Sequence, residues 1–219
     1  MLQDKQLFKL DIKIDSLTKR DLPEIAMLYQ NTFSHHFLGH MGQEFLMLFC
    51  SQFMNSSINY GYVAKCNGKT VGFLFGTVNE NPFYQFYRQN FIVLSLIVMK
   101  RYLMDSYVRK HIAKRLGYIL IAIKTLLPSS KRVNNAQYNK INTLVSARLL
   151  AIGVDSNYRG LGIANKLTSQ FCVEMKSAGY KMVELSVLAW NKRAISFYKK
   201  DGWIQEESTD SIVSFCRFI

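Results

Sequence analysis

The sequence predicts an α/β fold, a mixed β-sheet with helices on both faces. Three observations support this. The chain has 219 residues, 49% hydrophobic and 20% charged, a composition that suits a packed interior rather than a disordered chain. Segments with strand-like alternation are interleaved with segments of helical periodicity. One basic stretch interrupts that order. We therefore expect a single domain, residues 1–219, with a helical insertion at about 81–142.

The N-terminal part predicts one strand and two helices. Residues 10–17 alternate apolar and polar side chains, as a half-buried strand does. Residues 18–33 have helical spacing, with Pro23 suited to a first turn. A loop at 34–42 separates them from the apolar segment 43–54, which we expect to be a helix packed on the sheet.

A β-hairpin follows. Residues 60–66 and 70–78 are rich in β-favouring residues and flank Asn67-Gly68. Because Asn-Gly readily adopts the positive φ angles of a two-residue turn, this spacing predicts antiparallel pairing of the two strands.

The insertion differs in composition from the rest of the chain. Residues 81–142 hold eleven of the 28 Lys and Arg residues but only one acid, Asp105, for a net charge of +10. The remaining 157 residues contribute only +3. Within the insertion, residues 83–103 and 107–127 each predict a long helix with basic residues interspersed. Such asymmetry indicates an element with its own partner or environment.

The C-terminal part returns to alternating strands and helices. The expected order is strand 142–154, helix 159–177 with Gly179 as its C-terminal cap, strand 181–188, helix 191–201, and strands 203–206 and 211–218.

Cysteine spacing and the N-terminal segment limit the chemistry and the compartment. Cys50, Cys66, Cys172 and Cys216 form neither a CxxC pair nor a compact disulfide framework, so we expect no metal site and no redox chemistry. The first fifteen residues carry frequent charges and no continuous apolar core. We therefore expect the protein to be made and kept in the cytoplasm.

The segment 152–167, IGVDSNYRGLGIANKL, is where the sequence points most clearly to a ligand. A buried strand leads through a turn into a helix with a glycine-rich start. Gly160 and Gly162 allow close approach of the backbone, and the N–H groups of the helix start attract an anion. Arg159 adds a permanent positive charge. The segment predicts a phosphate site, although two glycines could serve only a tight turn.

A second segment, Asn191 to Trp203, makes the first more specific. With it the chain resembles the GNAT superfamily of acetyl-CoA-dependent N-acetyltransferases. The family's pyrophosphate loop, Arg/Gln-x-x-Gly-x-Gly/Ala, is matched by Arg159, Gly160, Leu161, Gly162, Ile163 and Ala164. Its later pattern, Asn…Ala…Phe-Tyr…Gly-Phe/Trp, is matched by Asn191, Ala194, Phe197-Tyr198 and Gly202-Trp203.

The resemblance implies acetyl-CoA as cosubstrate and a role for each matched position. Ile152, Gly153 and Val154 would lie on a splayed strand that pairs with the pantetheine arm, and a backbone N–H near Ile152 or Gly153 would stabilise the oxyanion. Residues 159–164 would hold the pyrophosphate, and Asn191 would bind the pantetheine. Tyr198 would protonate the departing thiolate. The structural alternative for Tyr198 is an aromatic ring packed under the sheet.

The proton acceptor is less clearly marked. Many GNAT enzymes place a carboxylate on the central strands, but residues 142–154 contain none, and Glu184 lies on the next strand. His35 and His36, with His40 nearby, lie in the loop where GNAT folds receive the acceptor, and an imidazole could deprotonate an ammonium directly or through water. The alternatives are packing histidines and removal of the proton by solvent.

The composition of the insertion allows several hypotheses about its partner. A basic, aromatic-rich helix pair at 83–127 suits peripheral contact with anionic lipid at the inner face of the membrane, and neither apolar run is long enough to span it. The alternative is that the apolar faces pack on each other or on a second subunit in a homodimer. The insertion is too apolar for a nucleic-acid surface.

A basic insertion together with Phe33-Ser34 and the pattern from Gly42 to Leu46 is similar to a GNAT subgroup linked to bacterial surface-polysaccharide synthesis. That similarity implies a small-molecule amine acceptor, an amino sugar that is nucleotide- or lipid-linked. The alternatives are a protein or peptide N-acetyltransferase, and a CoA-binding module that has lost transfer.

Overall fold

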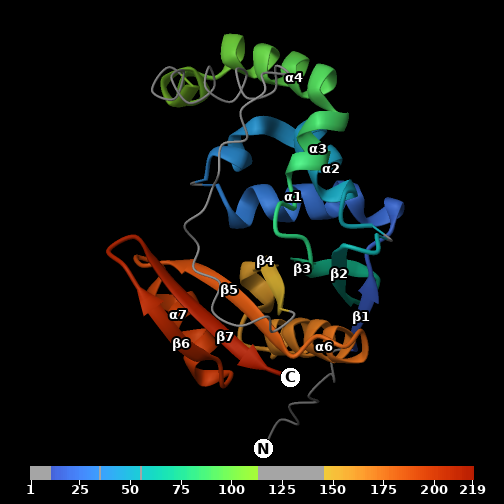
Figure 1. Ribbon diagram of the computed structural model, residues 1–219. Coiled ribbons are helices and arrows are strands. Elements are labelled where there is room, and N and C mark those ends of the chain that lie inside the picture. Colours follow the sequence, from blue (N-terminus) through green and yellow to red (C-terminus); the bar gives the residue numbers. More distant parts are fainter. Residues whose placement is uncertain (1–10, 35, 55, 113–145) are drawn as a thin grey trace, which may run out of the picture.

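The computed structural model describes residues 11–34, 36–54, 56–112 and 146–219. A seven-stranded mixed sheet runs through the molecule in the order β1-β2-β3-β4-β5-β7-β6 (Figure 1). All pairs are antiparallel except β4 with β5, which is parallel. The strands are β1 (Ile12–Ser16), β2 (Asn59–Cys66), β3 (Lys69–Thr77), β4 (Ser146–Val154), β5 (Met182–Leu188), β6 (Ile204–Ser208) and β7 (Ile212–Phe218).

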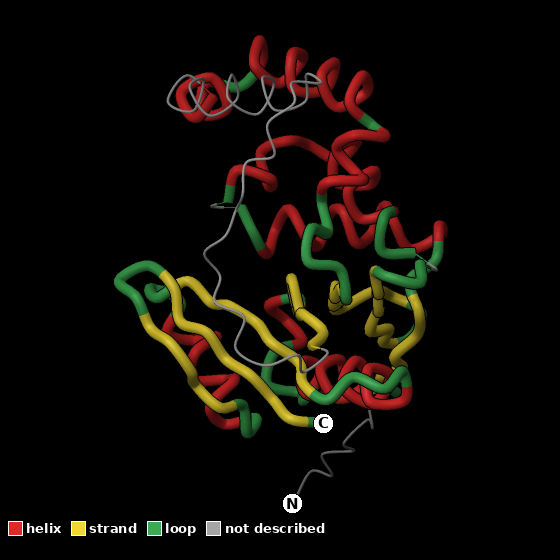
Figure 2. The backbone as a smooth tube through the Cα atoms, viewed as in Figure 1, coloured by secondary structure: helices red, strands yellow, loops and turns green. Residues whose placement is uncertain are grey.

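Helices cover both faces of this sheet, as the sequence predicts (Figure 2). The α-helices with described bounds are α1 (Leu22–Thr32), α2 (Gly42–Ser51), α3 (Tyr84–Gln89), α4 (Phe91–Met104), α6 (Ile163–Ser177) and α7 (Lys192–Lys200). On one face, α1 and α2 pack on β3 through an aromatic cluster that includes Tyr29, Phe49 and Phe73. On the other face, α6 and α7 form a second cluster with β5 and β7. The two clusters give the domain two hydrophobic layers.

The start of α1 follows from its sequence. The backbone N–H and hydroxyl of Thr18 both donate to the Asp21 carboxylate, closing a turn just before the helix. Pro23 lies in the first turn, where its missing N–H costs nothing. The Asp21 carboxylate also lies 2.7 Å from Lys65 Nζ on β2, which ties this helix start to the sheet.

The predicted hairpin is confirmed. Asn67 and Gly68 have φ angles of 50° and 80°, and β2 and β3 pair antiparallel on either side of them. Asn and Gly tolerate this left-handed backbone better than other residues, which is why the dipeptide marks the turn.

Two helix predictions need correction. The helix expected from Arg159 begins only at Ile163, because Gly160 and Gly162 adopt positive φ angles of 81° and 72° and hold the preceding residues in a loop. The helix expected over 83–103 is broken at Asn90 into α3 and α4. There the Asn90 side chain donates to the Phe86 carbonyl, so it competes with the regular helical pattern.

The insertion packs on α2 and on the loop before it. Leu94 and Ile97 of α4 are buried in the aromatic cluster, and Arg101 Nε donates to the Met41 carbonyl at 3.0 Å. Residues 106–112 are helical, and the rest of the predicted helix 107–127 lies outside the described residues, as do residues 142–145 of the predicted strand. Along the part of the chain that the structure describes, every helix is too short or too polar to cross a membrane.

Candidate active site

The sheet opens between β4 and β5. These two strands pair only over Ser146–Arg148 and Met182–Glu184. Beyond Arg148 they diverge, while β4 stays paired with β3 up to Val154. Residues 149–154, including the predicted Ile152, Gly153 and Val154, therefore line the opening. An unpaired strand edge offers backbone groups to an extended ligand as a neighbouring strand would.

A β-bulge lies at the start of this divergence. Phe75 pairs with Ala151 and Gly76 with Leu149, so Leu150 is the extra residue on β4. Bulges bend a strand and increase its local twist. The sequence carries no turn signal at this position, so the bend could not be read from it.

The glycine-rich loop connects the open end of β4 to α6. A Cβ placed on Gly160 or Gly162 would meet no atom within 4 Å, so the backbone there faces open space. Gly162 is the N-cap of α6. The first N–H groups of a helix lack partners within the helix and lie at the positive end of its dipole, so this loop has the geometry of an anion site.

Arg159 stands beside this anion site. Its Nε donates to the Val154 carbonyl at 3.2 Å, which fixes the side chain at the end of β4. Desolvation and the nearby cation of Arg193 on α7 lower the pKa of the Arg159 guanidinium. Because the two guanidinium groups repel each other, an anion bound near both would relieve the repulsion. Arg193 was not predicted from the sequence.

Asn191 begins α7 at the end of the same opening. Its side-chain oxygen accepts from the Ala194 N–H at 3.1 Å, a helix N-cap. This bond fixes the side chain in one orientation. Its predicted contact with pantetheine stays a prediction.

Tyr198, on α7, is nearly enclosed. Its side chain is only 3% exposed and packs against Phe197, Trp203 and Phe215. Burial raises the pKa of the Tyr198 phenol, so it is protonated at neutral pH, as a proton donor must be. The same packing is what the structural alternative describes. Its role as general acid stays a prediction.

The described histidines of the α1–α2 loop point to different parts of the molecule. The His36 ring lies edge-on to Phe33 at 5.4 Å and 6.3 Å from the ring of Trp190, the residue before Asn191. The structure therefore brings His36 to the opening. His35 lies outside the described residues. His40 turns toward the insertion, where it stacks on Tyr107 at 3.8 Å with its Nδ1 3.6 Å from Asp105.

Comparison with known proteins agrees with this geometry. The family model of the GNAT acetyltransferases matches residues 136–203, the segment that contains the glycine-rich loop, the opening and α7. The chain as a whole has the GNAT acetyltransferase fold. This fold is consistent with acetyl-CoA as cosubstrate, and the anion site and the open edge of β4 are where a GNAT enzyme would hold it.

Solved structures share the fold over nearly the whole chain. The Escherichia coli ribosomal-protein-S18-alanine N-acetyltransferase is 16% identical, with a TM-score of 0.54 over 95% of this chain and 94% of that one. The PaiA N-acetyltransferase of Thermoplasma acidophilum, solved with coenzyme A, is 13% identical, with a TM-score of 0.55 and coverages of 96% and 100%. An aminoglycoside N-acetyltransferase solved with CoA is 11% identical, with a TM-score of 0.58 and coverages of 91% and 92%. No curated protein matches the sequence at a significant level.

One acidic residue that no sequence motif marks supports the site. Asp201, which caps the C-terminal end of α7, accepts hydrogen bonds from donors in three elements. They are Asn165 and Thr168 on α6, Trp203 after α7, and Arg217 on β7. These bonds hold α7, and with it Tyr198, against the sheet. Asp201 could not be singled out because its partners on α6 and β7 are distant in sequence.

Glu184 lies where β4 and β5 diverge. Its carboxylate is 3.9 Å from the Arg148 guanidinium on β4. Both side chains project from the sheet face opposite the α6–α7 cluster, since Val183, Leu185 and Leu149 enter that cluster. The chain therefore does hold a carboxylate at the base of the opening, on β5 rather than on β4.

Proposed function

We propose that the protein transfers the acetyl group of acetyl-CoA to the primary amine of an amino sugar that is nucleotide- or lipid-linked, by direct attack in a ternary complex. The observation that carries the transferase chemistry is the continuous path from the open edge of β4, through the loop at Gly160 and Gly162, to the start of α6. It can hold an extended arm and a pyrophosphate together.

The chemistry assigns each group one step. The neutral amine attacks the thioester carbonyl carbon, and the backbone N–H of Ile152 or Gly153 stabilises the oxyanion. The C–S bond then breaks, and the thiolate takes the proton of the Tyr198 phenol. As the amide forms, its nitrogen loses the extra proton to solvent, and a proton from solvent restores the phenol. His36, with His35, is the proposed group that takes the proton which the substrate ammonium must lose, directly or through water, before its neutral amine can attack.

The acceptor assignment is supported by charge. The fold does not choose it, since the similar structures include an enzyme named for a ribosomal protein and one named for aminoglycosides. In the described part of the insertion, Arg88, Lys100, Arg109 and Lys110 are exposed basic residues, against the single acid Asp105. This surface suits an acceptor that carries a pyrophosphate, or the membrane on which a lipid-linked acceptor lies.

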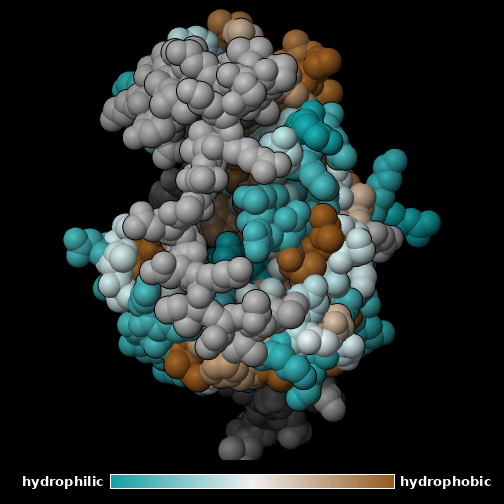
Figure 3. All heavy atoms as spheres, viewed as in Figure 1, coloured by the Kyte–Doolittle hydropathy of each residue, from teal (hydrophilic) through white to brown (hydrophobic). Residues whose placement is uncertain are grey.

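The same insertion has an exposed apolar stripe. Ile92, Leu96, Met99 and Leu103 recur at helical spacing along α4 and are each 60–74% exposed. They lie opposite Leu94, Ile97 and Arg101, which face the core and α2. Figure 3 shows hydrophobic side chains gathered over this end of the molecule. α4 thus has one apolar face for the core and a second that faces outward.

We propose that this stripe rests on anionic lipid. Its surroundings are strongly basic, and the insertion as a whole carries +10. Two copies that met through this surface would bring like charges together, whereas an anionic membrane would attract them. The protein is accordingly proposed to work in the cytoplasm at the inner face of the membrane.

The acceptor is tested by incubating the protein with radiolabelled acetyl-CoA and a cell extract, then counting label in nucleotide-sugar, organic-phase lipid and protein fractions. The proposal expects label in the sugar or lipid fraction. Label in protein alone would favour the peptide N-acetyltransferase. Acetyl-CoA binding with no label in any fraction would favour the CoA-binding module without transfer.

Membrane contact is tested by co-sedimentation with vesicles of phosphatidylcholine and phosphatidylglycerol. We expect binding that falls as salt rises and that is lost in a Leu96→Asp/Leu103→Asp variant. Val173→Asp/Ile204→Asp, which places the same two charges on exposed apolar sites of α6 and β6, is the matched control and should bind normally. Failure to bind at low salt contradicts the lipid proposal. A wild-type dimer that the double variant abolishes would assign the stripe to a second copy instead.

A further inference from the structure

We propose that Trp190 forms an aromatic wall of the acceptor site, on which the ring of the amino sugar stacks beside His36. This inference rests on the proposed function and names the residue that would select its acceptor. Trp190 belongs to neither family motif.

The exposure of Trp190 is unusual for its residue type. Its side chain is 63% exposed, whereas the second tryptophan, Trp203, is 4% exposed within the α6–α7 cluster. Tryptophan is highly buried on average, because its large ring gains much from leaving water. A tryptophan presented to solvent next to the opening between β4 and β5 is therefore available to a ligand.

The backbone holds this ring in place. The Asn191 N–H donates to the Leu188 carbonyl at 2.8 Å, and the Lys192 N–H donates to the Trp190 carbonyl at 2.9 Å. These bonds form a tight turn between β5 and α7, and the Asn191 cap follows at once. Because the backbone at Trp190 is already ordered, little backbone freedom is lost when a ligand stacks on the ring, which favours affinity.

Ring contacts link Trp190 to the other side of the opening. The Trp190 ring is 6.3 Å from His36, the His36 ring is 5.4 Å from Phe33, and Phe33 is 6.3 Å from Phe73 on β3. Phe73 pairs in the sheet with Gly153 of β4, where the pantetheine arm is expected. The wall and the proposed proton acceptor therefore lie together at the acceptor end of the site.

The chemistry of this wall fits an amino sugar better than a flexible amine. A pyranose has faces of C–H groups that pack on an aromatic ring, while its hydroxyls remain at the edge for polar partners. An ammonium near the indole face gains a cation–π attraction before it loses its proton. A linear polyamine shares only the second interaction.

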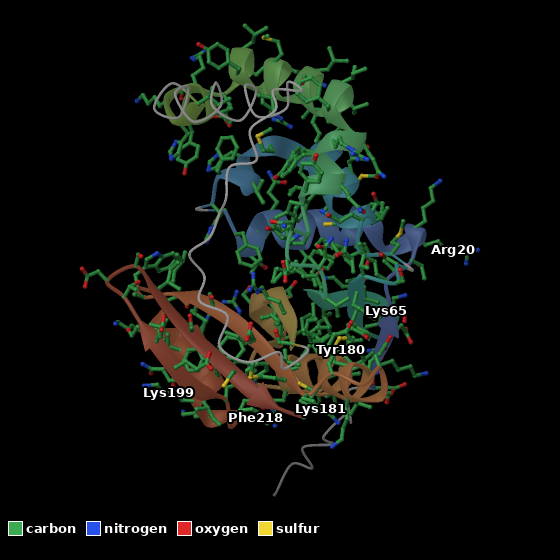
Figure 4. All side chains as sticks on the ribbon, viewed as in Figure 1. Arg20, Lys65, Tyr180, Lys181, Lys199 and Phe218 are labelled. Atoms are coloured by element: carbon green, nitrogen blue, oxygen red, sulfur yellow. The ribbon has the colours of Figure 1, made fainter. Side chains whose placement is uncertain are left out.

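The kinetic test compares three single variants with glucosamine, UDP-glucosamine and spermidine as acceptor probes. We expect Trp190→Ala to raise KM for the two amino sugars about three- to tenfold, the range of an aromatic contact, with KM for acetyl-CoA unchanged. Trp190→Phe should recover most of the affinity. Phe218→Ala removes another exposed aromatic, at the lower edge of β7 in Figure 4, and should change nothing.

A binding readout makes the test independent of turnover. Trp190 and Trp203 are the only tryptophans of the chain, so tryptophan emission should change as glucosamine or UDP-glucosamine is titrated in. That change should disappear in Trp190→Phe. No emission change with either sugar, or the same change in Trp190→Phe, overturns the inference.

The two proposals can fail separately. If amino sugars accept the acetyl group and Trp190→Ala keeps the wild-type KM for them, the aromatic wall is wrong and the proposed function stands. If label enters only protein while Trp190 emission still responds to the sugars, the binding site stands and the proposed function is wrong.

Discussion

Two halves of the proposed machinery differ in the groups that form their binding surfaces. The first half consists of β4, α6, β5 and α7, and the second half consists of α3, α4 and residues 106–112. In the first, backbone groups at a strand edge and a helix start form the site, and few side chains are needed. In the second, side chains form the surfaces: one face of α4 carries a buried row of apolar residues and the other face an exposed row. Local sequence motifs mark the first half, whereas composition alone marks the second. Under the proposed function, the first half performs the reaction and the second determines where it takes place.

Tyr198→Phe breaks that comparison most directly. If the phenol protonates the thiolate, kcat should fall about 100-fold or more, while acetyl-CoA binding stays near normal. Tyr29→Phe is the matched control, because it removes another buried phenol from the α1–α2 cluster. Steady-state kinetics that detect the released CoA directly measure kcat and KM for both variants. Full turnover with an unchanged pH profile in Tyr198→Phe would leave the ring with only its packing role.

Arg159→Gln tests whether the first half holds CoA without help from the basic insertion. Hydrogen bonds to charged groups contribute about 1.5–3 kcal/mol, so KM for acetyl-CoA should rise about 10- to 100-fold. Arg20→Gln removes a charge at the far edge of the molecule and should leave KM unchanged (Figure 4). A normal KM in Arg159→Gln would mean that the two halves share the cosubstrate.

Gly162→Ala sharpens the comparison, because Gly68, in the β2–β3 turn, has the same left-handed backbone conformation away from the site. Gly162 and Gly68 have φ angles of 72° and 80°, and a Cβ at either would meet no atom within 4 Å. Both alanine variants should lose about 1 kcal/mol of stability or slightly more. Only Gly162→Ala should also weaken acetyl-CoA binding, by about tenfold, since its Cβ enters the anion site. Thermal unfolding and CoA titration separate the two effects, and equal CoA affinity in both variants would contradict the anion site.

The sequence predicted the elements whose causes are local and missed those whose causes are distant. Asn67-Gly68 determines its turn by its own φ preferences, so the hairpin was predicted correctly. The beginning of α6 was placed too early because a glycine-rich helix start and a glycine-rich loop look alike until the φ angles are known. The Asp201 hydrogen bonds and the contact of His36 with Trp190 join segments far apart in the chain. Such contacts follow from the packing of the whole domain, and no local sequence pattern predicts them.

Low pH should destabilise the second half slightly and leave the first half unchanged. Asp105 accepts from the N–H groups of Tyr107 and Val108 and lies beside His40. Desolvation raises the pKa of this carboxyl, but these bonds and His40 outweigh it and hold the pKa below its usual value. A lowered pKa stabilises the folded state above about pH 4, the ordinary value for aspartate, and this stabilisation is lost as pH falls through the folded-state pKa.

Hydrogen exchange at residues 106–112 should therefore accelerate in acid relative to an Asp105→Asn variant measured at each pH, because asparagine keeps the cap without titrating. The effect should be small, since the pair is close to solvent. Exchange at β4 and α6 should show no such difference between the two proteins. Equal acceleration in both halves would show that the insertion does not open on its own, and that its position relative to the active site is fixed by the rest of the domain.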